Sequence, residues 1–391
     1  MYNLTTTCRF GGVETFVWEV SRELARRGEE VHILGGRGKI RKQIPGVKIS
    51  LFPFWPRDRL PNWGTRFRKL GERWSFGLFA LPKAIRERYD IVHIHKPFDL
   101  PLGVIIRKKT GSKLILGSHG TDFFPGDKIF GRRVDGIVAC SAFNGRQVEE
   151  RYGVAPRIIY NGIDPEIFRP VPPNLALQRQ LGLLTANRII VFTGRLIGLK
   201  GVGDLLRALA GLSETYPWQL LVIGEGESRV ALQKLSDGLG IGRRVIFTGF
   251  VPNDELPHYY ASADLAVFPS VADETFGVAI CEAMACGRAV VSTWVGGIPE
   301  LVIHGEAGLL ARPRDPADLG IKISQLLRED DLRRHLGEAA LRRVRRLFTW
   351  EKVADRLQQV YNAVMEGEKP TEQIQAESLP LLCPGEKEGR S

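Results

Sequence analysis

Residues 188–226 read RIIVFTGRLIGLKGVGDLLRALAGLSETYPWQLLVIGEG, and this stretch decides the fold. Its first segment, 188–195, is a short apolar run, and 201–213 carries apolar residues at helical spacing. A second apolar run, 218–226, ends in a glycine turn. A strand, a helix and a strand in this order predict a βαβ unit with parallel strands.

The same alternation continues in both directions along the chain. Towards the C-terminus it predicts a helix over 276–287 and strands over 244–250, 264–270 and 289–293. Towards the N-terminus it predicts a helix over 13–27 and strands over 30–36, 89–95, 113–120 and 135–141. Two such arrays in a chain of 391 residues predict an α/β protein with two Rossmann-like, doubly wound domains.

The segment NGIDPEIFRPVPPN at 161–174 joins the two arrays. Its four prolines in fourteen residues predict a stiff, non-helical connection. A further helix is predicted over 350–365, and the polar, Gly- and Pro-rich last 25 residues are predicted to be disordered. The predicted parts are an N-terminal domain at 1–165, a C-terminal domain at 166–347, a C-terminal helix at 348–366 and a tail at 367–391.

The charge of the chain is unevenly distributed. The net charge is +11, but residues 1–160 contain 29 Lys and Arg against 15 Asp and Glu, a balance of +14 that leaves −3 for the rest. A basic front half predicts an anionic surface partner. No recognised nucleic-acid-binding module is present, so anionic lipid is favoured over nucleic acid.

The segment 37–83 interleaves twelve basic residues with eight aromatic ones. The basic residues are Arg37, Lys39, Arg41, Lys42, Lys48, Arg57, Arg59, Arg66, Arg68, Lys69, Arg73 and Lys83, and the aromatic residues are Phe52, Phe54, Trp55, Trp63, Phe67, Trp74, Phe76 and Phe79. Such a pattern suits an anionic membrane surface. The alternative is that the aromatic rings belong to the core and the charges are merely solvated.

Cysteine usage and hydropathy bear on the compartment. The five cysteines are scattered, with no CxxC pair, so we expect neither a disulfide framework nor a zinc site. The sequence contains no run of 18 apolar residues and no signal peptide pattern. We therefore expect a cytoplasmic protein, peripheral on the inner face of the cytoplasmic membrane if the segment 37–83 binds lipid.

Cationic and glycine residues stand where phosphate groups bind in open α/β domains, beyond the carboxyl ends of strands. Gly11 and Gly12 precede a predicted helix, whose N-terminus suits a diphosphate, although such a pair is more often just a tight turn. Arg195 and Lys200 follow a predicted strand and could together hold a diphosphate without a metal. The alternative for these two is a solvated basic loop.

Three further polar residues are candidates. Glu274 and Glu282 are eight residues apart, and Glu282 lies in an otherwise apolar helix, where a carboxylate could accept both hydroxyls of a ribose. Glu274 would then meet a sugar, although two exposed glutamates on an amphipathic helix are the common alternative. His119 in SHGTD (118–122) follows a strand and could contact a sugar, although a lone histidine is more often structural.

The order and spacing of these motifs resemble the retaining family-4 glycosyltransferases of GT-B fold. The resemblance extends from Gly11 to Met365. The motifs that carry it are GGVETF (11–16), SHGTD, NGID (161–164), GRLIGLKG (194–201), VIGEG (222–226), TGFV (248–251), the glutamate pair and GGIPELV (296–302).

The resemblance implies a role for each matching residue. Catalytic roles are implied for His119, Glu274, Arg195 and Lys200. Donor-binding roles are implied for Gly11, Gly12, Arg195, Lys200, Gly224, Val251, Glu274, Phe276, Gly277, Val278 and Glu282. In this scheme Arg195 and Lys200 bind the diphosphate, Glu282 the ribose and Val251 the base through its backbone, while the last helix braces the first domain.

The activity implied is retaining transfer of a sugar from a nucleotide sugar to an acceptor, with no cofactor and no metal. A lipid-linked or cell-envelope glycan is the expected acceptor. Two alternatives stay open: a nucleotide-sugar epimerase or hydrolase of the same fold, and a non-catalytic partner that binds nucleotide sugar. A dinucleotide oxidoreductase is disfavoured because no GxGxxG follows the first strand.

The N-terminus departs from the family pattern. Only ten residues, MYNLTTTCRF, precede Gly11, and they are too few and too polar for a strand followed by a loop. We therefore expect the first strand to be truncated or degenerate, or the natural chain to begin further upstream.

Overall fold

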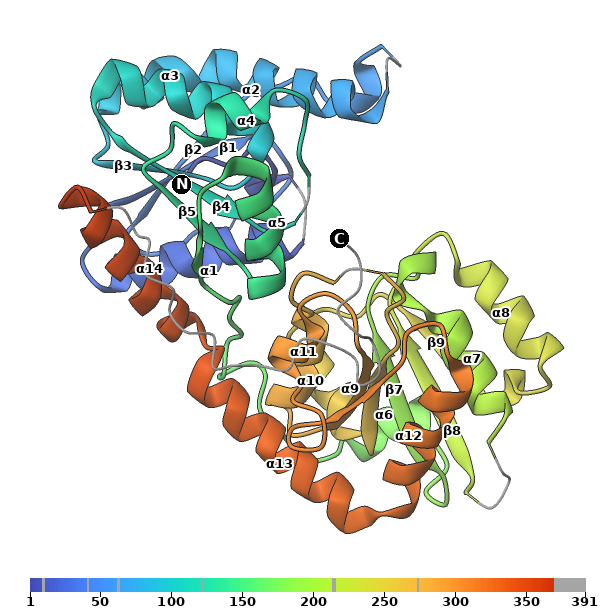
Figure 1. The fold of residues 1–391 in the computed structure, drawn as a ribbon. Helices are drawn as coiled ribbons and strands as arrows, with labels where there is room; N and C mark the ends of the chain where they lie inside the picture. The colour runs from blue at the N-terminus through green and yellow to red at the C-terminus, as the bar shows by residue number, and fades with distance from the viewer. Residues whose placement is uncertain are drawn as a thin grey trace. The chain divides into compact units, whose positions relative to one another are not determined.

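The structure is a computed structural model that describes residues 1–8, 11–40, 42–61, 64–120, 122–212, 216–272 and 274–368. The predicted tail at 367–391 lies outside this range except for its first two residues. The chain forms two compact units (Figure 1). Among the described residues, unit 1 comprises Met1–Gly162 and Trp350–Glu368, and unit 2 comprises Ile163–Thr349.

Unit 1 is built on parallel strands. The strands are β1 (Val31–Gly36), β2 (Val47–Phe52), β3 (Ile91–Ile94), β4 (Lys113–Ser118), β5 (Gly136–Ala139) and β6 (Arg157–Ile158). β1 pairs with β2, and the others pair in the order β3-β4-β5-β6. The carboxyl ends of all of these strands therefore lie along one edge.

The first residues of the chain connect these two groups of strands. Tyr2 forms parallel bridges to Leu34 of β1 and Ile94 of β3. Its N–H donates to the His93 carbonyl at 2.9 Å, and the N–H of Leu34 donates to the Met1 carbonyl at 2.9 Å. The expected first strand is thus reduced to a bridge around Tyr2, and a 3-10 helix, η1 (Leu4–Thr7), follows it.

Helices cover both faces of the unit 1 strands. They are α1 (Gly12–Arg26), α2 (Thr65–Glu87), α3 (Leu100–Thr110), α4 (Asp127–Gly131), α5 (Ala142–Tyr152) and α14 (Trp350–Met365), with the short 3-10 helices η2 (Arg57–Arg59) and η3 (Pro97–Asp99). One core joins α2 and α3 to Leu114 and Leu116 of β4. A second core, on the opposite face, joins α1 and α14 to Ile115. Alternate residues of β4 therefore point into opposite cores, as a strand requires.

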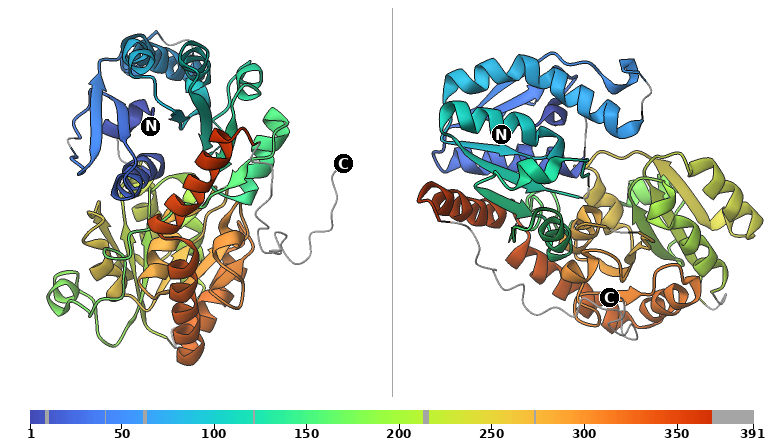
Figure 2. Two further views of the ribbon diagram at one scale, coloured as in Figure 1. Left: turned by 90° about the vertical axis from the view of Figure 1, so that its left-hand side faces the viewer. Right: turned by 45° about the horizontal axis from the view of Figure 1, so that its top comes forward.

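The helix predicted over 350–365 is confirmed as α14, and it packs along α1 of unit 1 (Figure 2). Its apolar stripe of Trp350, Val353, Leu357, Val360 and Val364 is buried against α1. This spacing of three, four, three and four residues places the five side chains on one face of the helix.

Unit 2 contains a single parallel sheet with the order β12-β11-β10-β7-β8-β9. The strands are β7 (Arg188–Thr193), β8 (Trp218–Ile223), β9 (Val245–Gly249), β10 (Leu265–Phe268), β11 (Ala289–Thr293) and β12 (Leu309–Ala311). Successive strands are added outwards in one direction from β7 and in the other direction from β10. The strand order therefore reverses between β7 and β10, which is where ligands bind in doubly wound sheets.

The helices of unit 2 enclose this sheet. They are α6 (Leu175–Gln180), α7 (Val202–Ala210), α8 (Arg229–Gly238), α9 (Leu256–Ala261), α10 (Val278–Ala285), α11 (Ile298–Leu301), α12 (Pro316–Arg328) and α13 (Asp330–Leu347), with the 3-10 helices η4 (Gly198–Lys200) and η5 (Gly242–Arg244). Every residue of β8, β10 and β11 is buried, which explains why these strands read as continuous apolar runs. The α/β, doubly wound prediction is confirmed.

Candidate functional site

The loops that follow β7 and β10 meet at the point where the strand order reverses. The N–H of Val271 donates to the carbonyl of Leu199 at 3.0 Å. Gly201 has φ 68°, and a Cβ atom there would lie 1.8 Å from the carbonyl oxygen of Pro269. Only glycine permits this approach, so the motif GRLIGLKG (194–201) ends in glycine for a steric reason.

Backbone hydrogen bonds also join the loops that follow β7, β8 and β9. Gly194 N–H donates to Ile223 at 3.0 Å, and Gly224 N–H donates to Gly249 at 2.8 Å. Gly224 has φ 133°, and a Cβ atom on it would lie 2.0 Å from the Gly194 carbonyl oxygen. Gly224, predicted as a donor-binding residue, therefore allows the loops after β7, β8 and β9 to pack closely together. We call these joined loops the ledge.

A predicted residue of the ledge forms an ion pair with a predicted residue of the loop after β10. The ammonium group of Lys200, in η4, binds the carboxylate of Glu274, and each side chain is about one quarter exposed. Arg195 is exposed, and no hydrogen bond or ion pair reaches its guanidinium from the described residues. An anionic ligand here would find Arg195 free and would compete with Glu274 for Lys200.

Glu274 is held by its backbone as well as by Lys200. The N–H of Gly297 donates to the Glu274 carbonyl at 2.7 Å. Gly296 has φ 58°, and a Cβ atom on it would lie 2.2 Å from the same carbonyl oxygen. The sequence analysis noted this glycine pair in GGIPELV but assigned it no role. Its role is to let α11 approach the backbone of Glu274.

Glu282 lies on α10 and is 8% exposed. No hydrogen bond or ion pair reaches its carboxylate from the described residues, and burial raises its pKa to about 8. The alternative of two exposed glutamates is therefore wrong for Glu282. A buried carboxylate without partners favours a ligand that brings hydroxyl donors, as a ribose does.

The start of α10 is the next part of the site. Gly277 precedes the helix with φ 93°, and Val278 is its first residue. The ring of Phe276 is buried and packs edge-on against Phe348 at 5.6 Å. The ring of Phe276 is therefore unavailable to a ligand. Polar contact from these three predicted donor-binding residues would have to come from the backbone of Phe276, Gly277 and Val278.

The loop after β9 contains one predicted residue and one that the sequence analysis missed. The side chain of Val251 is 7% exposed and belongs to the core, so a contact with a ligand would have to come from its backbone. The neighbouring Phe250 is 73% exposed. A free aromatic ring at the carboxyl end of β9 offers a stacking surface, and its only sequence signal was its place in TGFV.

In unit 1, His119 follows β4 and is not a lone histidine. Its ring packs near His95, with Nε2 3.4 Å from Nδ1 of His95, and His93 stacks on His95 with ring centroids 4.2 Å apart. Burial lowers the pKa of His119 to about 3, so the ring is neutral at physiological pH. His119 can exchange a hydrogen bond with a ligand hydroxyl but cannot supply a positive charge.

Gly11 and Gly12 lie at the N-terminus of α1, as the sequence predicts. Gly12 is the first residue of the helix, and Gly11 precedes it with an extended φ of 173°. Any residue can adopt that conformation, so the backbone does not require glycine at Gly11. Both residues are exposed, which leaves the first turn of α1 accessible to a ligand.

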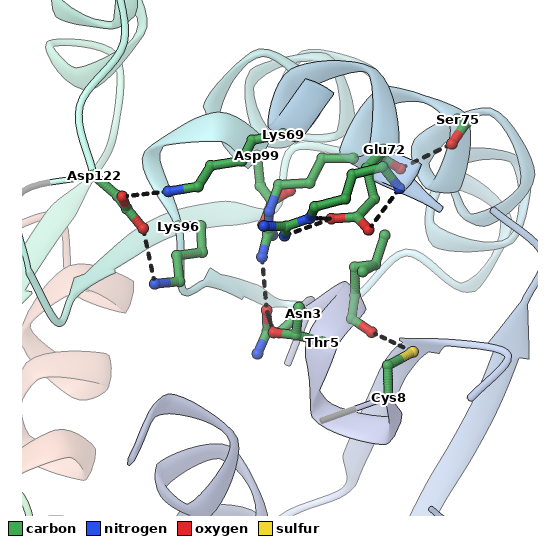
Figure 3. A network of polar contacts seen from close by, with 12 residues as sticks. Asn3, Thr5, Cys8, Lys69, Glu72, Ser75, Lys96, Asp99 and Asp122 are labelled. Carbon is green, nitrogen blue, oxygen red and sulfur yellow. Dashed lines mark hydrogen bonds and ion pairs between the residues drawn. The ribbon is translucent and has the colours of Figure 1, made fainter. Parts of the chain in front are cut away.

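Figure 3 shows a polar network of unit 1 that the sequence did not predict. The carboxylate of Asp122 accepts from Lys69 of α2 at 2.7 Å and from Lys96, after β3, at 3.5 Å. Arg73 of α2 also forms a buried ion pair, with Asp99. Burial lowers the pKa of Lys96. Two lysines and a carboxylate therefore stand at the carboxyl edge of unit 1.

The basic and aromatic segment 37–83 divides into two groups. Phe76 is a core residue, as the alternative of core aromatic rings supposes, whereas Arg57, Lys69 and Arg73 are engaged in ion pairs rather than merely solvated. The large apolar side chains that remain exposed are Trp55, Phe67, Trp74, Leu78 and Phe79. Arg41 and Trp63 lie outside the described residues.

Metal-binding clusters and membrane-spanning helices are two further features to consider in the described part of the chain. No group of three or more His, Cys, Asp or Glu side chains is placed to hold a metal ion there. Among the same residues, every helix is too short or too polar to cross a bilayer.

Two family models match the chain. One, described as Glycosyltransferase Family 4, matches residues 10–167, and the other, described as Glycosyl transferases group 1, matches residues 175–343. The D-inositol 3-phosphate glycosyltransferase of Thermomonospora curvata is 30% identical to the chain and covers 90% of both sequences. D-inositol 3-phosphate glycosyltransferase 1 of Catenulispora acidiphila is 32% identical and covers 91% of this chain and 92% of its own length.

Solved structures share the fold at lower identity. Sucrose-phosphate synthase from Thermosynechococcus elongatus has a TM-score of 0.81 at 22% identity, covering 94% of this chain and 98% of its own. Anabaena HepE, solved in complex with UDP and glucose, has a TM-score of 0.77 at 21% identity, covering 93% and 98%. Both show the GT-B arrangement of two Rossmann-like domains. The chain therefore belongs to family 4 of the glycosyltransferases and is a glycosyltransferase of GT-B fold.

Proposed function

We propose that the protein transfers a sugar from a nucleotide-sugar donor to an acceptor with retention of configuration and without a metal ion. The observation that carries the proposal is the set of groups at the strand-order reversal of unit 2. There, the free guanidinium of Arg195 and the ammonium of Lys200 suit a diphosphate, and the unpartnered carboxylate of Glu282 suits a ribose.

The two cations would stabilise the leaving group. As the bond between the anomeric carbon and the phosphate oxygen lengthens, negative charge builds on the diphosphate, and fixed positive groups stabilise that state more than the ground state. Lys200 would exchange Glu274 for the phosphate when the donor binds. Glu274 would then be released to bind hydroxyl groups of the transferred sugar, and the neutral His119 would exchange a hydrogen bond with the same sugar.

Retention is best explained by attack from the same face as the leaving group. The acceptor oxygen forms its bond to the anomeric carbon while the carbon–phosphate oxygen bond breaks, and the acceptor's proton passes to the departing phosphate. This mechanism needs no protein nucleophile, because the acceptor oxygen itself attacks the anomeric carbon. A covalent sugar trapped on Glu274 or His119 would contradict this mechanism.

For the acceptor, we propose a lipid-linked or cell-envelope glycan reached at the cytoplasmic face of an anionic membrane. The support is the exposed apolar stripe on α2, formed by Phe67, Trp74 and Leu78, in a helix with basic residues. Aromatic rings beside basic groups favour the interface of an anionic bilayer.

A phosphorylated polyol is the second candidate acceptor. Two relatives that cover at least nine tenths of the chain are D-inositol 3-phosphate glycosyltransferases. The pair of lysines around Asp122, Lys69 and Lys96, offers a phosphate two cations at the carboxyl edge of unit 1.

A thermal-shift screen tests the donor site. The protein is heated with UDP-, GDP- and ADP-sugars, each with and without a chelator, and a donor at 100 times its dissociation constant adds about 2.7 kcal/mol of stability. We expect one nucleotide to stabilise the protein regardless of chelator, and Arg195→Ala with Lys200→Ala to remove the shift. Stabilisation that requires a divalent cation would contradict the metal-free proposal.

A transfer assay then separates the two acceptors. The labelled donor identified above is incubated with anionic vesicles containing membrane lipid extract or with inositol phosphate, and the product is analysed by NMR. An axial-to-axial or equatorial-to-equatorial outcome at the anomeric carbon establishes retention, whereas inversion would overturn it. Label in the lipid phase supports the first acceptor, and label on the soluble phosphate ester supports the second.

A further inference from the structure

Three histidine rings form a column in unit 1. The rings of His93 and His95 stack with centroids 4.2 Å apart and planes inclined by 26°, and those of His95 and His119 are 5.6 Å apart and inclined by 30°. Nδ1 of His95 lies 3.4 Å from Nε2 of His119. At the other end of the column, the hydroxyl of Tyr361 on α14 lies 2.7 Å from Nδ1 of His93.

The backbone of β4 and the side chain of Phe16 define the space that the column occupies. A Cβ atom on Gly117 would lie 2.8 Å from His93 Nε2, 3.1 Å from His95 Nδ1 and 3.3 Å from His119 Nε2. Glycine at this position therefore admits all three rings. The ring of Phe16 packs edge-on against the opposite side, with its centroid 4.7 Å from that of His119 and 5.7 Å from that of His95.

Each of the two inner rings is oriented by one hydrogen bond. Nε2 of His93 and Nε2 of His95 are buried and have no partner among the described residues. His93 is therefore held through Tyr361, and His95 through its contact with His119. Burial lowers the pKa of all three histidines, so each ring is neutral, and a hydrogen bond at one nitrogen decides which nitrogen carries the proton.

We propose that Tyr361, His93 and His95 are positioning residues for His119: His95 fixes the tautomer of His119 through their hydrogen bond, and Tyr361 and His93 hold His95 in place, so that His119 is oriented for a hydroxyl group of the transferred sugar. This inference rests on the proposed function, because it takes His119 as a sugar-binding residue. The column is not a continuous path for protons, since the step from His93 to His95 is a stacking contact. The column instead holds each ring against the next, from the hydroxyl of Tyr361 on α14 to His119 at the carboxyl end of β4.

The first test is spectroscopic and does not depend on any ligand. The chain has seven histidines, and long-range ¹H–¹⁵N spectra report the tautomer of each ring. We expect His119 in the wild-type protein to show one neutral tautomer from pH 6 to 8. Tyr361→Phe should shift or broaden the signals of His119, because the stack that holds its ring loses the hydrogen bond to α14. A charged or tautomerically averaged His119 in the wild-type protein would overturn the proposal, even if the variant did not fold.

The control is Tyr89→Phe. Tyr89 also contacts a histidine of unit 1, with its hydroxyl 2.6 Å from Nδ1 of His32, but this pair lies outside the column. Tyr89→Phe should change the signals of His32 and leave those of His119 as they are. Equal changes at His119 in both variants would show a general loosening of unit 1 and would contradict a specific positioning role.

The second test separates sugar binding from nucleotide binding. We expect Tyr361→Phe to weaken binding of the nucleotide sugar by about tenfold, the equivalent of one hydrogen bond, and to leave binding of the nucleoside diphosphate unchanged. Equal loss for both ligands would contradict the proposal. If the wild-type protein binds no nucleotide sugar, the proposed function fails, while the tautomer of His119 still decides whether the column positions that ring.

Discussion

At the scale of single residues, the candidate site combines a paired and an unpaired carboxylate. Glu274 is neutralised by Lys200, whereas Glu282 is buried with no charged partner among the described residues. Burial alone therefore raises the pKa of Glu282 to about 8, because the charged form loses its hydration without compensation. A ligand hydroxyl that donates to this carboxylate would restore part of that loss.

The pH dependence of donor binding tests Glu282. Hydroxyl donors stabilise the ionised carboxylate, so donor binding should release a proton below pH 8, and affinity should rise from pH 6 to pH 8. In Glu282→Gln we expect weaker binding that no longer varies with pH in this range. Calorimetric titration in two buffers of different ionisation enthalpy measures the proton release, and a wild-type affinity that falls with pH would refute this role.

Gly224→Ala tests the ledge at the carboxyl ends of β7 and β8. The added methyl group would lie 2.0 Å from the Gly194 carbonyl oxygen in a backbone conformation that alanine avoids. We expect a loss of about 2–4 kcal/mol in unfolding free energy, since steric overlap and backbone strain add. Gly238→Ala in α8 is the matched control, because no atom lies within 4 Å of its added Cβ. Denaturant titration should find the control neutral or slightly stabilised.

At the scale of elements, α2 has two different faces. Its inner face contributes Phe76, Ala80 and Ala84 to the core, and Arg73 to a buried ion pair. Phe67, Trp74 and Leu78, at spacings of seven and four residues, form one stripe on its exposed face. The inner face explains why the helix folds, whereas Trp74 and Leu78 of the stripe are 49% and 67% exposed.

Vesicle binding tests the exposed stripe of α2. We expect Trp74→Ser with Leu78→Ser to reduce binding to anionic vesicles by at least about tenfold, because each side chain contributes more than 1 kcal/mol when buried in the interface. The matched control is Ile105→Ser with Ile129→Ser, two exposed apolar residues of unit 1 that lie on α3 and α4. Flotation assays at low and high salt provide the measurement, and equal binding by both double variants would contradict membrane docking through α2.

At the scale of the whole molecule, the two units should respond to pH in opposite directions. The buried histidines of unit 1 have lowered pKa values in the folded protein, about 3 for His119, whereas a histidine of the unfolded chain has a pKa near 6.5. Below pH 6.5 the unfolded chain therefore binds more protons than the folded protein. Their contribution to stability is present above that pH and is lost as the pH falls. Glu282 of unit 2 has a raised pKa, so its contribution is present below about pH 4.5 and is lost as the pH rises towards 8.

Differential scanning calorimetry between pH 5 and pH 8.5 tests this opposition. Each such group changes the unfolding free energy by up to about 1.4 kcal/mol per pH unit. We expect unit 1 to unfold at a lower temperature at pH 5 than at pH 8. We expect Glu282→Gln to stabilise unit 2 at pH 8 and to have no such effect at pH 5. If Glu282→Gln changed the unfolding free energy equally at both pH values, the raised pKa of Glu282 would not contribute to stability, and this prediction would be wrong.

Much of the fold could be predicted because it depends on local patterns. The runs that became β7, β8, β10 and β11 are buried on both faces, so their continuous apolar residues identified them. α14 was predicted from residue 350 to residue 365 because its apolar stripe has helical spacing. β2 and α2 were missed, since the aromatic and basic residues of 37–83 obscured their periodicity.

For the site, the sequence by itself determined which residues stand at strand ends, because polar groups and glycines interrupt apolar runs at those points. Arg195, Lys200, Glu274 and His119 were identified in this way, whereas Glu282 was identified as a carboxylate in an otherwise apolar helix. Only the tertiary structure decided which of them interact. The ion pair of Lys200 with Glu274, the burial of Glu282 and the stacking of His119 on a column that ends at Tyr361 join residues far apart in the chain. Local sequence cannot report such contacts, because they depend on strand order and on which loops the sheet brings together.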